Sequence, residues 1–261
     1  MHVLWITLVT IGTHRAFFPN TIPQLHQMKT FNNIQAIVFD ADDTLWDCQS
    51  YFEKVENRLC DMLSPWGTHD EISSALFATE AANMPVLGYG CKAFTLSVIE
   101  CAINISHGEI KAESIGELAE MGKALQNLPG TPLDGVISTL EKLKDSGAYR
   151  LAVFTKGELL DQENKLRRSG LEGYFSHVEI VSDKTELSYR NLCRNMDIAP
   201  EEMVMVGNSF KSDIVPAITV GAYAIHIPFH VTWQLEHTQE FEHERLAKVS
   251  HFKDIMKVIP V

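Results

Sequence analysis

The sequence predicts an α/β protein: a Rossmann-like three-layer core with a parallel sheet, plus an inserted helical-bundle cap domain. Three observations predict this fold. A short apolar run, Ala36–Phe39, ends abruptly on acids; a long helix-periodic stretch follows it; and the chain then alternates between short apolar runs and amphipathic segments. Alternation of that kind is typical of a parallel sheet with helices on both faces. We therefore expect residues 31–47 and 128–261 to form the core and residues 48–127 to form the cap.

The overall composition is that of an ordinary globular protein. The chain has 261 residues, of which 45% are hydrophobic and 21% charged, and its formal net charge is -12. Nucleic acids and anionic membranes bind basic surfaces, so we expect neither as a partner. A small anionic substrate is compatible with this charge, because a local site can be positive on an acidic protein. No pattern indicates the oligomeric state.

The cysteines indicate a reducing compartment. There are five of them, scattered along the chain without a CxxC pair. An odd, scattered set favours free thiols over disulfides or a metal site. We therefore expect a cytoplasmic protein.

We interpret residues 1–30 as an N-terminal extension outside the domain. Val3–Ile11 is apolar but too short to span a bilayer, and it lacks the basic start and the cleavage site of a secretory signal. Met28 stands immediately before KTFNNIQAIVFD, a natural domain start. Residues 1–27 are therefore consistent with an over-long start assignment, and a signal-anchor or targeting segment is the alternative.

Apolar residues at helical spacing predict four helices between residues 48 and 127. These helices lie over Tyr51–Leu63, Ile72–Thr79, Phe94–Ile105 and Ile115–Leu125. Four helices in so short a stretch form a compact bundle.

Beyond Pro129 the pattern alternates between helices and strands. Helices are expected over Val136–Leu143, Glu158–Ser169, Glu186–Met196 and Asp213–Val220, and strands over Leu151–Thr155, Val178–Val181, Met203–Gly207 and Tyr223–Ile227. Gly147 and Gly170 mark helix ends. Residues 246–259 predict a closing helix.

Polar side chains follow four of the predicted strands, at the point where each strand ends. They are Asp40 and Asp42, Thr155 and Lys156, Lys184, and Asn208 with Asp213. The carboxyl ends of parallel strands meet at one edge of the sheet, where ligands bind, so we expect these side chains to lie close together. Of two carboxylates placed there, one can attack while the other moves a proton, or both can hold a hard cation such as Mg²⁺.

Two further segments are expected near this edge. Met84–Phe94 is loop-like and aromatic, and it either lines a pocket or packs between helices. Trp233 belongs to the loop after the last core strand, which can approach the rim of the site.

The polar strand ends resemble the motifs of the haloacid dehalogenase-like (HAD) superfamily. VFDADDTLW resembles its first motif, DxDxT, and FTKG resembles the second, whose key member is Ser or Thr. Lys184 in VSDKTE stands where the family has its third-motif lysine, and VGNSFKSDI resembles the fourth motif, GDSxxxD. The match runs in order from about Ile34 to Ile227, and the helical insert resembles the family's type-one cap.

The resemblance implies a catalytic role for four residues. Asp40 would attack phosphorus and form an aspartyl-phosphate, and Asp42 would protonate the leaving alcohol and then activate water. Thr155 would hydrogen-bond a phosphoryl oxygen, and Lys184 would neutralise charge on Asp40 and the phosphate. Phosphate binding is assigned to Ala41, Asp43, Thr155, Lys156 and Lys184, with backbone N–H groups after Asp40 forming a cradle. Asp43 is alternatively a turn or cap residue, and Lys156 alternatively faces solvent or the cap.

The resemblance also implies Mg²⁺, held by Asp40, the backbone carbonyl of Asp42, Asn208 and Asp213. The family usually has Asp where this chain has Asn208. An amide oxygen still ligates Mg²⁺ but carries no charge, so Asp213 would supply the main acidic contribution of this loop. The departure weakens metal binding, shifts metal preference or marks a degenerate enzyme.

The sequence thus predicts a Mg²⁺-dependent phosphohydrolase, a phosphoric monoester hydrolase, that acts on a small phosphorylated metabolite. Asp42 favours phosphoryl transfer over dehalogenation, because displacing a halide needs no protonated leaving group. The alternatives are a phosphomutase or a haloacid dehalogenase on the same fold, and a catalytically weakened binding protein, which Asn208 motivates. A cap that closes over the site suits small molecules.

Overall fold

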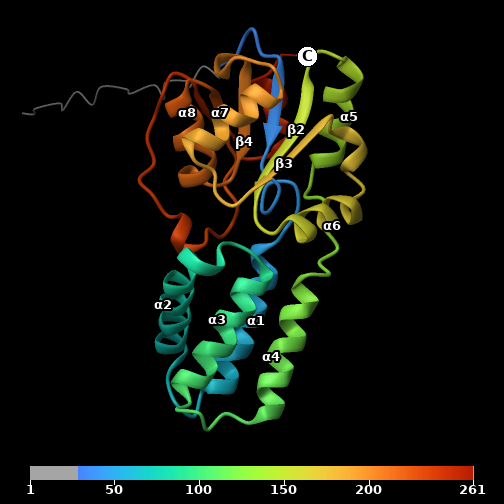
Figure 1. Cartoon of the computed structure of the whole chain (residues 1–261). Helices are drawn as coiled ribbons and strands as arrows, with labels where there is room; N and C mark the ends of the chain where they lie inside the picture. The colour runs from blue at the N-terminus through green and yellow to red at the C-terminus, as the bar shows by residue number, and fades with distance from the viewer. Residues whose placement is uncertain (1–28, 261) are drawn as a thin grey trace, which may run out of the picture.

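The structure is a computed structural model that describes residues 29–260. The predicted N-terminal extension, residues 1–30, lies almost entirely outside the described residues. Figure 1 shows two stacked bodies, a sheet with helices on either side above and a bundle of four helices below. The chain leaves the upper body after its first strand and returns to it after the bundle. The predicted fold class, a Rossmann-like core with an inserted helical bundle, is confirmed.

Six parallel strands form the core sheet. They are β1 (Ala36–Phe39), β2 (Arg150–Lys156), β3 (His177–Val181), β4 (Met203–Gly207), β5 (Tyr223–His226) and β6 (Leu246–Lys248). Their order across the sheet is β3-β2-β1-β4-β5-β6, and Ala36 is in register with Arg150 on one side and Met203 on the other. The order changes direction between β1 and β4, and in open α/β sheets ligands bind at the carboxyl ends of the strands at such a point.

Helices cover both faces of the sheet. The right-hand face in Figure 1 is covered by α5 (Val136–Ser146) and α6 (Leu159–Ser169), and the left-hand face by α7 (Glu186–Asn195) and α8 (Val215–Val220). Alternate side chains of β1 point to opposite faces. Ile37 and Phe39 pack into the core under α5, and Ala36 and Val38 pack into the core under α7. A strand buried on both faces needs apolar residues throughout, which explains the unbroken run before the acids.

The bundle below the sheet confirms the four predicted helices. They are α1 (Gln49–Leu63), α2 (His69–Leu87), α3 (Cys91–Ile105) and α4 (Ala112–Leu125). Their facing sides form a separate hydrophobic core around Leu59, Ile72 and Leu118, all fully buried. A capping box starts α2, in which Glu71 accepts the backbone N–H of Thr68 and Thr68 accepts that of Glu71.

The predicted closing helix over residues 246–259 is wrong. Leu246–Lys248 is instead the edge strand β6, and Phe252–Lys257 is a 3₁₀ helix. Leu246 and Ala247 pack into opposite cores, which is the period-two alternation of a strand. The strand completes the sheet beside β5, a pairing across the fold that local spacing does not reveal.

Two helix boundaries near the site also differ from the prediction. The helix α2 continues through Pro85, so the expected loop Met84–Phe94 shrinks to three residues, 88–90. The helix expected from Asp213 begins at Val215, after a π-helical turn over Phe210–Ile214. Further 3₁₀ turns cover Glu172–Tyr174, Pro200–Glu202 and Gln234–Glu236.

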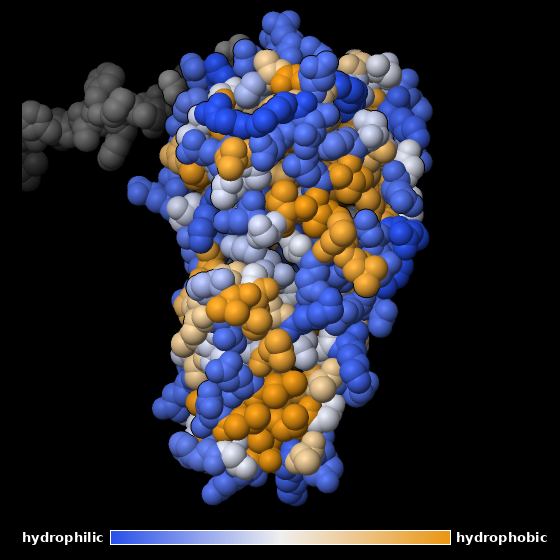
Figure 2. All heavy atoms as spheres, viewed as in Figure 1, coloured by the Kyte–Doolittle hydropathy of each residue, from blue (hydrophilic) through white to orange (hydrophobic). Residues whose placement is uncertain are grey.

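The surface in Figure 2 is mostly hydrophilic at the top of the core, and apolar clusters lie over the lower right of the core and over the helical bundle. Exposed large apolar side chains include Val86, Leu96 and Ile103 of the bundle and Leu159 and Leu160 of α6. Within residues 29–260, no helix is long and apolar enough to cross a membrane.

Candidate active site

A pocket of about 200 Å³ lies between the core and the helical cap. Its core side is lined by Asp40, Asp42, Asp43, Thr155, Lys156, Lys184, Asn208 and Asp213. One predicted site residue, Ala41, does not line the pocket, because its side chain is fully buried. The carboxyl ends of the first four strands deliver the other residues to one place, although they span more than 170 positions of the chain.

Lys184 joins two acids in this pocket. Its Nζ lies 2.5 Å from Asp40 Oδ1 and 2.6 Å from Asp213 Oδ1, and its side chain is 1% exposed. Burial lowers the pKa of Lys184, but the charges of Asp213 and Asp40 outweigh that effect and hold the pKa above its usual value. Burial raises the pKa of Asp40 to about 7, with Lys184 acting in the opposite direction. A cation is therefore fixed against the carboxylate at the tip of β1.

Asp42 is held by four hydrogen bonds from three side chains. Lys165 Nζ lies 2.8 and 2.7 Å from its two carboxylate oxygens, Gln162 Nε2 donates at 2.8 Å, and Trp46 Nε1 donates at 2.7 Å. Burial alone would raise the pKa of Asp42, but Lys165 and the other donors bring it below its usual value. Asp42 is therefore an ionised carboxylate in this arrangement.

The sequence pattern did not reveal Gln162 and Lys165 as site residues, because α6 reads as a charged surface helix. In the structure its polar residues turn inward: Lys165 is 2% exposed, whereas Leu159 and Leu160 are 62% and 64% exposed. A sequence signal did exist, since Gln162 and Lys165 lie three positions apart, on one face of a helix, beside the buried Leu166. Locating their partner required the packing of α6 against the tip of β1.

Asp43 shapes the turn into the cap. Its backbone has a φ of 62°, and its Oδ1 accepts the backbone N–H groups of Cys48 and Gln49 at 2.8 and 2.9 Å. These contacts fit the turn or cap role that the sequence also allowed. Thr155 is 3% exposed at the end of β2 and lines the pocket, as its assignment to phosphate binding requires.

The oxygens around Asn208 suit a small hard cation. The Thr44 hydroxyl lies 3.2 Å from both Asp40 Oδ2 and Asn208 Oδ1. A hydroxyl carries one hydrogen, so it satisfies only one of these oxygens and leaves the other as an acceptor. Carboxylate, amide and backbone carbonyl oxygens are the ligands that Mg²⁺ takes in proteins, and the residues present fit this ion.

Both carboxylate oxygens of Asp213 are already engaged by other groups. Its Oδ1 is bound to Lys184, and its Oδ2 accepts the backbone N–H of Ser209 at 2.9 Å. Among the residues that the structure describes, no group of three or more His, Cys, Asp or Glu side chains is arranged to hold a metal ion. A metal at this site therefore depends on Asn208 and a backbone carbonyl in addition to Asp40.

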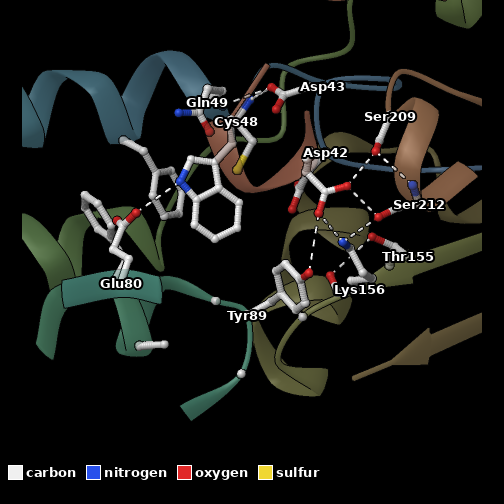
Figure 3. A pocket seen from close by; sticks show the side chains of 18 of the residues that line it. Asp42, Asp43, Cys48, Gln49, Glu80, Tyr89, Thr155, Lys156, Ser209 and Ser212 are labelled. Carbon is white, nitrogen blue, oxygen red and sulfur yellow. Dashed lines mark hydrogen bonds and ion pairs between the residues drawn. The ribbon is translucent and has the colours of Figure 1, made fainter. Parts of the chain in front are cut away.

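Lys156 is engaged by a second acid that the sequence analysis did not single out. Its Nζ lies 2.6 Å from Glu236 Oε1 and 2.7 Å from Ser212 Oγ, and Ser209 Oγ donates to Glu236 at 2.5 Å. Burial alone would raise the pKa of Glu236. The charge of Lys156 and the hydrogen bonds from Lys156, Ser209 and Ser212 have the larger combined effect and bring the pKa down to about 2. The side chains of Tyr89, Lys156, Ser209 and Ser212 converge in Figure 3.

The loop between β5 and β6 connects the core to the cap, as expected for Trp233. Trp233 Nε1 donates to Glu80 of α2 at 3.0 Å, and its ring meets the edge of Tyr89 at 5.9 Å. Burial raises the pKa of Glu80 to about 7. Two cap residues thus meet the core across the mouth of the pocket.

Acids, a hydroxyl and a buried lysine at the ends of parallel strands, covered by a helical cap, define a capped α/β hydrolase. A sequence profile of haloacid dehalogenase-like hydrolases matches residues 34–221. The chain belongs to this family.

Similar proteins include two curated phosphatases and one solved hydrolase. Glyceraldehyde 3-phosphate phosphatase of Methanothermobacter thermautotrophicus is 28% identical, over 76% of this chain and 88% of its own. Pyrimidine 5'-nucleotidase YjjG of Escherichia coli is 25% identical, over 79% and 95%. A haloacid dehalogenase-like hydrolase from Xanthomonas campestris is 31% identical with a TM-score of 0.74, over 85% of this chain and 91% of that chain.

Proposed function

We propose that this protein is a Mg²⁺-dependent phosphatase that hydrolyses a small phosphorylated metabolite through an aspartyl-phosphate. The observation that carries the proposal is the carboxylate of Asp40 held 2.5 Å from buried Lys184, with a second carboxylate, Asp42, two residues on. A haloacid dehalogenase needs no second acid, since halide leaves without a proton. The phosphatase names of the curated relatives support the same conclusion.

The proposed reaction has two displacements at phosphorus. First, an oxygen of Asp40 bonds to phosphorus as the ester P–O bond breaks, and the departing alkoxide takes a proton from Asp42. Next, water attacks the aspartyl-phosphate, its proton passes to Asp42, and the P–O bond to Asp40 breaks to release inorganic phosphate. Lys184 compensates the charge of Asp40 and of the phosphoryl oxygens in both steps, and Thr155 would bind one of those oxygens.

Asp42 must carry a proton when the alcohol leaves, although its pKa is low in the structure. A bound phosphate dianion near Asp42 places like charge beside it and raises its pKa. Substrate binding itself would thus make Asp42 an acid, and departure of phosphate would return it to the ionised form held by Lys165.

Asp40, Asn208 and the backbone carbonyl of Asp42 would hold the Mg²⁺, and Asp213 would add negative charge from the same loop as Asn208. When bound there, the ion supplies positive charge against the phosphate and the attacking carboxylate. The fourth-motif departure, Asn208, leaves this set with one charge fewer than an aspartate would provide.

The cap and the thiols support the remaining parts of the proposal. A pocket of about 200 Å³ under the cap fits a small ligand, and closure of the cap over that ligand would exclude bulk water. The five cysteines are all free and buried, which supports a cytoplasmic location.

The test is phosphate release from p-nitrophenyl phosphate in the presence of Mg²⁺. We expect turnover in the wild type and a loss of about 10³-fold or more in Asp40→Asn, which removes the nucleophile. Chloride release from haloacids without phosphate-ester turnover would instead favour the dehalogenase. Isomerised phosphate esters without free phosphate would favour a phosphomutase, and no turnover with any divalent cation would favour a binding protein.

A further inference from the structure

We infer that the cap side of the pocket selects phosphate esters whose alcohol carries an ammonium group and disfavours those that carry a second anion. The inference rests on the proposed phosphatase activity and names its substrate class. It follows from the charges, hydrogen bonds and aromatic rings that line the pocket beyond the phosphate end.

The described lining of the pocket holds no unpaired cation for an anionic leaving group. Among its described lining residues the cations are Lys156 and Lys184. Lys184 is bound by Asp40 and Asp213, and Lys156 is bound by Glu236 at 2.6 Å. A carboxylate or second phosphate on the substrate would therefore face acids without a partner, which is costly in a partly buried site.

Glu80 is a buried carboxyl without a countercharge. It is 8% exposed, its hydrogen bond comes from the neutral indole of Trp233 at 3.0 Å, and no cation among the described residues pairs with it. Glu56, also in the lining, adds like charge and raises the pKa of Glu80 further. A substrate ammonium would supply the missing charge at this point.

Polar groups beside Glu80 on the cap wall offer acceptors to a ligand. Both amide hydrogens of Asn83 are used, on Ser97 Oγ at 3.1 Å and on Glu100 at 2.9 Å. Ser97 donates its own hydrogen to the Ala93 carbonyl at 3.0 Å. The oxygen of Asn83 and the carboxylate of Glu80 remain as acceptors, so an N–H donor of a ligand is matched at this part of the wall. The Gln49 amide, which also lines the pocket, can donate to a neutral acceptor but carries no charge for an anion.

Aromatic rings surround the same region. Phe52 and Phe94 lie 4.8 Å apart between ring centroids, and Tyr89 meets Trp233 at 5.9 Å. All four line the pocket, and ring faces attract cations. One of these rings already makes a cation–π contact, since Lys156 Nζ lies 3.8 Å from the centre of the Tyr89 ring.

The two ends of the pocket fix the orientation of the substrate. Figure 3 shows Glu80 on the cap side, across the pocket from Thr155 and Lys156 at the ends of the core strands. A phosphate bound at the strand ends would therefore extend its alcohol toward Glu80 and the rings.

The experiment compares esters that differ only in terminal charge. Phosphate release is measured for ω-aminoalkyl, ω-hydroxyalkyl and ω-carboxyalkyl phosphates of matched length, from two to five carbons, at pH 7.5. At the best length we expect kcat/KM to be about tenfold higher for the amino than for the hydroxy ester, and lowest for the carboxy ester. A carboxy ester equal to or better than the amino ester overturns the inference.

Glu80→Gln, with Asp70→Asn as its control, assigns the preference to this side chain. Both changes remove one charge from α2, but Asp70 is 104% exposed and lies outside the pocket. We expect Glu80→Gln to bring the amino-to-hydroxy ratio close to one and Asp70→Asn to leave it unchanged. An unaltered ratio in Glu80→Gln overturns the assignment. Hydrolysis without charge preference refutes only this inference, whereas no hydrolysis of any ester, p-nitrophenyl phosphate included, refutes the proposed phosphatase.

Discussion

Asp42 depends on a buried lysine that lies 123 positions away in the chain. Lys165 binds both oxygens of Asp42 and also lies 3.4 Å from Asp161, so one ammonium compensates two acids. Asp42 needs this support because it stands two residues from Asp40, and the charge of one acid disfavours that of the other. We regard Lys165 as a positioning residue that holds Asp42 ionised and oriented between turnovers.

Lys165→Met should show this dependence in the free energy of unfolding. The variant leaves two carboxylates without their cation, and we expect a loss of about 2 to 3 kcal/mol, at the low end for a buried pair because Asp42 is 27% exposed. The double variant Lys165→Met, Asp42→Asn should lose clearly less than the sum of the two single variants. Urea unfolding of the four proteins measures this coupling, and additive losses would contradict it.

Glu80 gives a second prediction at the same scale. Its pKa is raised from 4.5 to about 7 in the folded protein, so the folded state holds the proton more tightly than the unfolded chain. Stability should therefore fall as pH rises from about 4.5 through 7 because of this group. Glu80→Gln removes the cost, and we expect it to be more stable than wild type by about 3 kcal/mol above pH 7 and equal below pH 4.5. Thermal unfolding at pH 4.5 and pH 8 measures the difference, and an advantage at the lower pH would be inconsistent with it.

At the scale of elements, local patterns predicted the strands and helices whose buried faces show as runs or regular spacings of apolar residues in the sequence. The run Ala36–Phe39 and the cap helices are of this kind, because burial on two faces gives an unbroken apolar run and burial of one helix face gives apolar residues at helical spacing. The acids, hydroxyl and lysine at the strand ends followed, since parallel topology alone brings such ends together. Their pocket was therefore predictable, while their chemical roles remain proposals.

Other elements were set by partners distant in sequence. The edge strand Leu246–Lys248 exists because β5 offers it backbone hydrogen-bonding groups, and a short apolar segment reads equally well as part of a helix. Gln162 and Lys165 point inward because Asp42 lies there, so their helix looks like a surface helix when read alone. Glu236 likewise becomes the ion-pair partner of Lys156 only when its loop packs beside that residue.

At the scale of the whole molecule, ion pairs and hydrogen bonds join the cap to the core around the pocket. Lys92 of the cap is paired with Glu158 of the core, and Trp233 reaches Glu80, while each body keeps its own hydrophobic core. Interfaces of this polar kind permit relative motion of two bodies, which would let the cap open for substrate and close over it.

The acids between these bodies also link metal binding to the stability of the whole fold. Asp40, Asp42 and Asp213 lie together, with Lys184 and Lys165 as their cations. A cation that binds only the folded site stabilises it by mass action, by about 2.7 kcal/mol when its concentration is 100 times the dissociation constant. We therefore expect Mg²⁺, added after chelation, to raise the melting temperature by about 5 to 10 °C.

Asn208→Asp should enlarge that response. The new carboxylate would stand beside Asp40, so like-charge repulsion should lower the melting temperature without metal. Because the new ligand is charged, the rise in melting temperature on adding Mg²⁺ should be larger than in the wild type. Asn104→Asp adds the same charge at an exposed position of α3 and serves as the control, for which we expect the wild-type gain. Scanning calorimetry over a Mg²⁺ titration measures all three proteins. Equal gains in the wild type and Asn208→Asp would show that residue 208 is not a ligand, and no gain in any of them would count against a metal at the strand ends.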